Sequence, residues 1–358
     1  MNAFFSRLGS VLCALRVWTV NILSLLVLLY VVGVIVYVFA RLPDKVDPDG
    51  KVLVIAPKGT VLEQEVFPKN PNFLLGMPSM SQIQSRDLVK LIRGAAQDER
   101  LTGVLLDFSK TSFAGAATAL RIAEELAALR ESGKPVIAFS ESLTTSSYLM
   151  AAQADEIYVH PSGAVAISGL GGYRDYTREL TDKLKVTMHN YSQGDFKSAV
   201  ESRTRTEMSP ADRLQREALY GPIWSSFKTA MGEPRELDPE LFQQLADNHP
   251  GLLSEAAYDN LAWAEREGVI TGTLGFPAFR ALMIEKFGRD EEDEERETYP
   301  HISWDAYLAQ LPADDSEAED AVAVVFVEGG IRTGDIGPGV AGSHDVARLI
   351  RRAYENED

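Results

Sequence analysis

A continuous apolar run near the N-terminus is the first feature of the hydrophobic pattern. No formal charge occurs between Arg16 and Arg41, in the stretch VWTVNILSLLVLLYVVGVIVYVFA. About 20 apolar residues span a bilayer as a helix. Trp18 and Tyr37 lie where aromatic residues meet the membrane interface. The pattern therefore predicts a transmembrane anchor at residues 17–40.

The short tail at residues 1–16 leaves a second interpretation open. A cleavable signal peptide also begins with a basic region and an apolar run, and Val38 and Ala40 fit a cleavage site. Its apolar region is about 7–15 residues long, so an uncleaved anchor is preferred. Basic residues occur on both sides of the run, so the positive-inside rule does not decide the orientation.

Short β-branched runs alternate with amphipathic segments in the next part of the chain. This alternation predicts a parallel sheet with helices on its faces. The expected strands are 102–108, 134–140, 156–161 and 187–192. The expected helices are 115–133, 145–155 and 177–186. Residues 209–287 are expected to be mainly helical, beginning with Ser209 as N-cap and Pro210 in the first turn.

The hydrophobic pattern also repeats along the chain. The stretch KVLVIAPKGTVLEQE at 51–65 is matched by AVAVVFVEGGIRTGD at 321–335. SRDLVKLIRGAAQDER at 85–100 is matched by SHDVARLIRRAYENED at 343–358. The stretches 85–100 and 343–358 each predict an amphipathic helix with a serine at its N-terminal cap and an acid near its start. The aligned pairs include Gly59 and Gly329, Asp87 and Asp345, Leu91 and Leu349, and Ile92 and Ile350.

This repeat suggests a domain organisation. We expect a first domain at 46–310, an acidic linker at 311–320, and the start of a second, similar domain at 321–358. A strand–helix opening cannot bury its own apolar face, so the second domain is expected to have its core beyond Asp358. Two unrelated strand–helix units are the alternative.

Charge and composition exclude some classes of function. The net charge of −17 argues against nucleic acid, whose phosphates attract basic surfaces. The acidic runs at 289–297 and 313–320 are interpreted as solvated loops or linker, with an interaction site as the alternative. Cys13 is the single cysteine, so no intrachain disulfide forms.

No residue pattern predicts a metal or a cofactor. The five histidines have no metal-ligand spacing and no pairing with a serine motif, so each is interpreted as structural or surface. GLGG at 169–172 lacks the lysine of a P-loop and the spacing of a dinucleotide fingerprint, so it is interpreted as a tight turn. The histidines are His160, His189, His249, His301 and His344.

Two segments resemble a known peptidase family. GKPVIAFSESLTTSSYLMAAQADEIYVHPSGAVAISGLGG at 133–172 and LKVTMHNYSQGDFKSAVE at 184–201 are similar to the SppA-type signal peptide peptidases (protease IV), in their long tandem-domain form. The resemblance implies an α/β, crotonase/ClpP-like fold of repeated ββα units. It implies a membrane-anchored serine peptidase with a Ser–Lys dyad, which degrades cleaved signal peptides and other short apolar peptides.

The resemblance also implies an assembly and a location. The expected form is a homo-oligomeric ring, a tetramer in this family, tethered to the bacterial inner (cytoplasmic) membrane by a single pass. The large domain would be periplasmic, and the partners would be peptide substrates and the membrane, without nucleic acid, metal or cofactor.

Lys197, in the F-K-S-A-V-E signature, falls on the lysine that serves as general base in this family. A lysine acts as a base near neutral pH only when its pKa falls several units below about 10.4, and burial does this. The apolar neighbours Phe196 and Val200 suit such burial. A surface lysine is the alternative. Ser198 is a possible supporting residue, with a plain surface serine as its alternative.

The nucleophile is not matched in this chain. Thr145 stands where the family serine would fall, without the flanking glycines. The loop that supplies oxyanion donors keeps Asp107 but has Lys110-Thr111-Ser112 in place of Pro-Gly-Gly. The resemblance therefore implies that the serine and the oxyanion hole belong to the second domain, beyond Asp358.

Two other functions stay open at this point. An acyl-CoA hydratase or isomerase could use the same fold. A non-catalytic membrane-anchored scaffold, a pseudo-peptidase, would explain the missing nucleophile.

Overall fold

The described parts of the chain form two units. The computed structural model describes residues 2–39, 46–64, 81–254, 259–291, 297–312, 322–337 and 339–355. Contacts divide the chain into residues 1–46 and residues 47–358. Most of the expected linker, residues 313–320, lies outside the described residues, as do residues 292–296 of the first acidic run.

The first unit is one long helix, α1 (Asn2–Phe39). Its stretch Arg16–Val34 has a mean hydropathy of 2.3 and no buried residue. By length and composition alone, this helix is able to cross a membrane.

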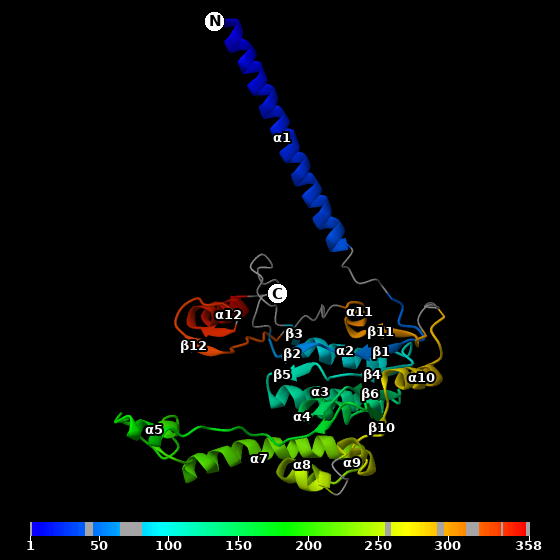
Figure 1. The fold of residues 1–358 in the computed structure, drawn as a ribbon, viewed down its shortest axis with the longest axis vertical. Coiled ribbons are helices and arrows are strands. Elements are labelled where there is room, and N and C mark those ends of the chain that lie inside the picture. The colour runs from blue at the N-terminus through cyan, green and yellow to red at the C-terminus, as the bar shows by residue number, and fades with distance from the viewer. Residues whose placement is uncertain are drawn as a thin grey trace. The chain divides into compact units, whose positions relative to one another are not determined.

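The second unit is built on a six-stranded parallel sheet with strand order β10-β8-β6-β4-β1-β11 (Figure 1). The central strands are buried along their whole length, as parallel strands covered on both faces must be. The six strands are β1 (Val52–Ile55), β4 (Gly103–Leu106), β6 (Val136–Ser140), β8 (Glu156–Val159), β10 (Gly272–Thr273) and β11 (His301–Ser303).

Each of the first core strands is followed by a short strand and a helix, which confirms the expected ββα units. The short strands pair with one another in separate small sheets, β3-β2-β5 and β7-β9. They are β2 (Gly59–Leu62), β3 (Gln82–Gln84), β5 (Thr111–Phe113), β7 (Leu143–Thr144) and β9 (Val165–Ala166). The helices are α2 (Ser85–Gln97), α3 (Ala116–Glu131) and α4 (Thr145–Ala151).

Apolar side chains cover both faces of the sheet. On one face, Val52, Ile137 and Phe139 pack against Phe279 and Met283 of α10 (Phe276–Phe287). The rings of Phe139 and Phe279 stack with centroids 4.2 Å apart. Alternate strand residues point to the other face and are equally buried, and helices α2, α3 and α4 contact one another in order there.

The C-terminal half of this unit is mainly helical, as expected. Ser209 caps α7 (Pro210–Gly232) by accepting a hydrogen bond from the amide of Asp212, which confirms the cap predicted from the sequence. The remaining elements are η2 (Glu233–Arg235), α8 (Pro239–Ser254), α9 (Asn260–Arg266) and α11 (Trp304–Leu308). Strand β11 was not expected from the sequence, and it extends the sheet beside β1.

Three local predictions were wrong. Residues 187–192 form no strand, because they are exposed and no neighbouring strand offers its hydrogen-bonding groups. Ser85 lies inside α2 rather than at its cap, and its hydroxyl donates to the Glu63 carboxylate at 2.8 Å. The GLGG segment makes a bend at Leu170 rather than a hydrogen-bonded turn.

The sequence repeat is also a repeat of local structure. In the first copy, β2 and β3 pair in parallel with Val61 opposite Ile83, and α2 follows. In the second, β12 (Gly330–Arg332) and β13 (Val340–Gly342) pair with Ile331 opposite Ala341, and α12 (Ser343–Glu355) follows. These are the equivalent positions of the sequence alignment. The preceding glycines, Gly59 and Gly329, have φ of +130° and +87°, where a side chain would be strained.

The two copies differ in what covers their helices. Leu91 and Ile92 of α2 are fully buried, whereas Leu349 and Ile350 of α12 are 43% and 56% exposed. The second copy therefore has the same local structure without a core. The expected second domain stays a prediction.

Hydrogen bonds between Asp98, Arg100 and Tyr307 attach α11 to the end of α2, and we call these three residues the polar clasp. Asp98, after α2, accepts hydrogen bonds from Arg100 Nη2 at 2.8 Å and from the Tyr307 hydroxyl at 3.0 Å. The hydrogen bond from Arg100, with that from Tyr307, outweighs burial and lowers the pKa of Asp98 from 3.8 to about 2.

We expect Asp98→Asn to lower the free energy of unfolding by about 1–2 kcal/mol at pH 7. A lowered pKa in the folded state stabilises the protein above the unfolded-state value. The difference in free energy of unfolding between the wild type and Asp98→Asn should therefore become smaller as the pH falls from about 4 to about 2. Urea unfolding at a series of pH values measures it, with Asp182→Asn in an exposed ion pair as control. A constant difference across this range would contradict the role given to the clasp.

Candidate functional site

The predicted catalytic lysine lies in an exposed segment between the sheet and α7. We call residues 173–208 the lysine arm; its regular elements are α5 (Arg178–Lys183) and α6 (Glu201–Thr204) (Figure 1). Several large apolar side chains in the arm are exposed. They are Tyr173, Leu180, Leu184, Val186, Tyr191 and Phe196. The arm has little apolar cover within the described chain.

Lys197 is itself exposed, so the burial expected from the sequence is wrong for this chain alone. Phe196, its apolar neighbour, is 54% exposed and does not cover it. The Lys197 ammonium makes no hydrogen bond or ion pair with any residue that the structure describes. Lys197 is exposed because hydrogen bonds and ion pairs hold the arm in place, and no apolar core covers it.

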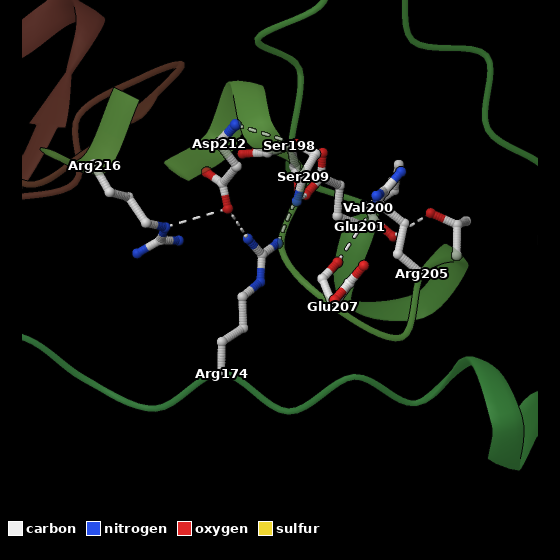
Figure 2. A network of polar contacts seen from close by, with 10 residues as sticks. Arg174, Ser198, Val200, Glu201, Arg205, Glu207, Ser209, Asp212 and Arg216 are labelled. Carbon is white, nitrogen blue, oxygen red and sulfur yellow. Dashed lines mark hydrogen bonds and ion pairs between the residues drawn. The ribbon is translucent and has the colours of Figure 1, made fainter. Parts of the chain in front are cut away.

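The backbone next to Lys197 is held by a polar network centred on Asp212 (Figure 2). Arg174 donates from Nη1 to Asp212 Oδ2 at 2.9 Å and from Nη2 to the Ser198 carbonyl at 2.8 Å. Arg216 Nε donates to the same carboxylate oxygen at 3.2 Å. The Asp212 side chain is only 4% exposed. We call Asp212, Arg174 and Arg216 the Asp212 clamp.

The clamp keeps Asp212 ionised. Burial opposes ionisation, but hydrogen bonds from Ser198 and Arg216, together with the charges of Arg216 and Arg174, outweigh it. The pKa of Asp212 therefore lies below its ordinary value of 3.8. The hydroxyl of Ser198, the possible supporting residue, contributes to this lowering of the Asp212 pKa.

Glu201, the last residue of the signature, ties the same segment to α7. Its carboxylate accepts the amide of Ser209 at 3.2 Å, and its own amide donates to the Ser198 carbonyl at 3.1 Å. Thr177 donates its amide to the Ser202 carbonyl at 2.7 Å and so joins the two sides of the arm.

The hydroxyl of Thr145, which the sequence resemblance places where the family serine would fall, takes part in two structural hydrogen bonds. It donates to the Ser168 carbonyl at 2.7 Å and accepts the Ser168 amide at 2.8 Å. Its neighbours Thr144 and Ser147 form a capping box at the start of α4. None of these hydrogen bonds involves a base that could remove the proton of a nucleophile.

In the loop after β4, the amides of Ser109 and Thr111 already have hydrogen-bond acceptors within the loop. The Ser109 amide donates to Asp107 Oδ1 at 3.0 Å, and the Thr111 amide donates to the Phe108 carbonyl at 3.1 Å. Gly59 uses the Lys110 carbonyl as its acceptor. The retained acid, Asp107, therefore stabilises the loop itself.

A groove of about 720 Å³ opens beside the GLGG segment. Residues 168–173 form one wall, and Tyr220 and Trp224 of α7 contribute aromatic lining. Arg216 of the clamp also lines the groove.

The histidines lie in local contacts. His160 hydrogen-bonds to Ser162, His249 to Asn260, and His301 to the Tyr299 carbonyl. Within the described ranges, no group of three His, Cys, Asp or Glu residues could hold a metal ion.

This chain is similar in sequence to a known peptidase family. Residues 128–265 match Peptidase family S49. Protease 4 of Salmonella typhi is 31% identical over 268 residues, which is 75% of this chain and 42% of that protein. Protease 4 of Haemophilus influenzae is 28% identical over 277 residues, 77% of this chain and 44% of that protein. The resemblance to SppA-type peptidases is confirmed, although the chain spans less than half of these relatives.

Solved structures give weaker matches. A variant of the 1510-N membrane-bound stomatin-specific protease matches with a TM-score of 0.35 and 12% identity, over 72% of this chain and 94% of that one. An enoyl-CoA hydratase/carnithine racemase from Magnetospirillum magneticum matches with a TM-score of 0.29 and 13% identity, over 57% of this chain and 62% of that one.

The exposure of Lys197 is testable by chemical labelling. We expect acetic anhydride to modify Lys197 in this chain about as fast as the exposed Lys183, and much faster than Lys134, whose ammonium donates to the Ala96 carbonyl at 2.9 Å. Peptide mapping by mass spectrometry measures the three rates. Slow labelling of Lys197 in the isolated chain would contradict the exposed position.

Proposed function

We propose that this chain, which resembles SppA-type peptidases and matches family S49 over residues 128–265, is the lysine-bearing part of a membrane-anchored serine peptidase. The observation that carries the proposal is Lys197 in the F-K-S-A-V-E signature. The Asp212 clamp fixes its segment, and its ammonium has no hydrogen-bond or ion-pair partner among the residues that the structure describes. A lysine in a structural ion pair would lack such freedom.

The serine nucleophile is proposed to come from outside these 358 residues. The hydroxyl at the equivalent position, that of Thr145, is bonded on both sides to Ser168, and the amides of Ser109 and Thr111 are already paired. An oxyanion hole needs amides aimed at the developing charge. A second domain of the same fold, of which 321–358 would be the start, is the proposed source of both.

The proposed reaction is amide hydrolysis through an acyl-enzyme. Lys197 in its neutral form would accept the proton of the serine hydroxyl as the oxygen attacks the scissile carbonyl. It would then donate that proton to the leaving amine, and the same cycle with water would release the acid. Covering of the arm by the serine-bearing domain would remove water from around the lysine, which favours the neutral amine.

The substrates are proposed to be short apolar peptides, including remnants of cleaved signal peptides. Helix α1 would hold the enzyme in the bacterial inner membrane, where such remnants are left, with the second unit in the periplasm. The exposed apolar residues of the arm would be covered in a homo-oligomeric ring, a tetramer by resemblance.

Two other functions make different predictions. An acyl-CoA hydratase or isomerase would bind an acyl thioester to the second unit, and saturable binding would favour it. A non-catalytic scaffold would show no peptide turnover in the natural membrane protein that carries this sequence.

We expect Lys197→Ala to lower kcat for a fluorogenic apolar peptide by at least about 10³-fold, because the variant removes the amine that is proposed to take the proton from the serine. The assay uses the natural membrane protein, with Lys183→Ala as a matched control on the same arm. Circular dichroism and thermal unfolding should be unchanged in both. Wild-type turnover by Lys197→Ala would refute the general-base role.

A further inference from the structure

Asp212 lies at the meeting point of the start of the arm, the Lys197 segment and the first turn of α7. We propose that Asp212 is a positioning residue for Lys197 and that it acts through Arg174. This inference rests on the proposed function, since it gives Asp212 a role in catalysis only if Lys197 is the base.

The bridge through Arg174 is short and two-pronged. One guanidinium nitrogen binds the Asp212 carboxylate at 2.9 Å, and the other binds the Ser198 carbonyl at 2.8 Å. Because the Ser198 carbonyl follows Lys197 by one residue, fixing it fixes the direction from which the lysine side chain leaves the backbone. The guanidinium also lies over the Tyr176 ring, 5.8 Å from its centroid, which restricts its rotation.

Asp212 is the anion that holds both arginines of the clamp. The carboxylate is nearly fully buried and accepts from two guanidinium groups, so it supplies the one fixed anion that both share. Planar guanidinium groups match carboxylates in direction as well as charge. An asparagine keeps the size of Asp212 but removes the charge that holds Arg174 in its bridging position.

The clamp is separate from the hydrophobic core. The buried apolar residues of α7, which packs on α3, α4 and α8, begin at Trp224, 12 residues after Asp212, or about 18 Å along the helix. The cap of α7 is supplied by Ser209 and accepts the backbone amide of Asp212, not its side chain. Loss of the carboxylate should therefore loosen the arm and leave the sheet and its helices intact.

The test compares Asp212→Asn with Asp182→Asn in the natural membrane protein that carries this sequence. Asp182 is a matched control, since it pairs with Arg178 on the same arm but is 66% exposed. We expect Asp212→Asn to lower kcat by about 10- to 100-fold with KM changed by less than about twofold. Amide exchange at residues 201–205 should become about tenfold faster or more, with exchange in β4 and β6 unchanged. Asp182→Asn should match the wild type.

A second variant separates positioning from general destabilisation. Arg174→Met removes the bridge while keeping the carboxylate, and should lower kcat to a similar degree. The double variant should be no worse than the poorer single variant, because both changes break one unit. Additive losses, or faster exchange throughout the sheet, would overturn the positioning role.

The outcomes also separate the two proposals. Wild-type peptide turnover by Lys197→Ala would contradict the proposed function. If Lys197→Ala loses turnover but Asp212→Asn keeps wild-type kcat and wild-type amide exchange, only the positioning role of Asp212 is contradicted.

Discussion

A parallel sheet that is buried on both faces sets the conditions for the rest of this structure. Strands such as β4 and β6 have apolar side chains pointing both ways, so each face needs a layer of helices. The chain meets this need by following β1, β4 and β6 each with a helix, and by returning α10 across the opposite face. The ββα order and the parallel direction of the strands follow from that need, whereas α7 packs on α3, α4 and α8 rather than on the sheet.

The lysine arm does not cover a face of the sheet, so the need to bury apolar side chains does not determine its structure. It leaves the sheet after β9 and returns through α7, and several of its large apolar residues are exposed. Its order comes instead from charges and backbone hydrogen bonds: the Asp212 clamp, the Glu201 carboxylate on the Ser209 amide, and Thr177 on Ser202. Such contacts fix a backbone without covering it. A lysine that is held but not covered is suited to a site completed by another surface, because the covering surface then controls its contact with water.

The sequence predicted most of the fold, because its hydrophobic periods are strong. The buried strands at β4 and β6, the helix that ends before Gly133, and the Ser209 cap were all found from local pattern. Strand β11 was missed because it has three residues and only one buried side chain, which is too short to show an alternation of apolar and polar positions. These residues form a strand only because they pair with β1. The strand expected at 187–192 was wrong for the converse reason, since a suitable pattern found no partner.

The site was predicted less completely. The signature pointed to Lys197, but apolar neighbours in sequence did not mean burial in space, as the exposed Phe196 shows. The clamp was missed because Arg174 and Asp212 are separated by 38 residues and neither lies in a motif. The one available signal was weak: an aspartate three residues after the Ser209 cap, where its side chain faces back toward the start of the helix.

The central claim is that Lys197 activates a serine that these residues do not contain. Labelling the natural membrane protein with a fluorophosphonate, followed by peptide mapping, tests it most directly, because the reagent modifies an activated serine covalently. The account predicts one labelled serine outside residues 1–358, and loss of that label in Lys197→Ala. Labelling of Ser146 or Ser147, or full labelling of the Lys197→Ala protein, would contradict it.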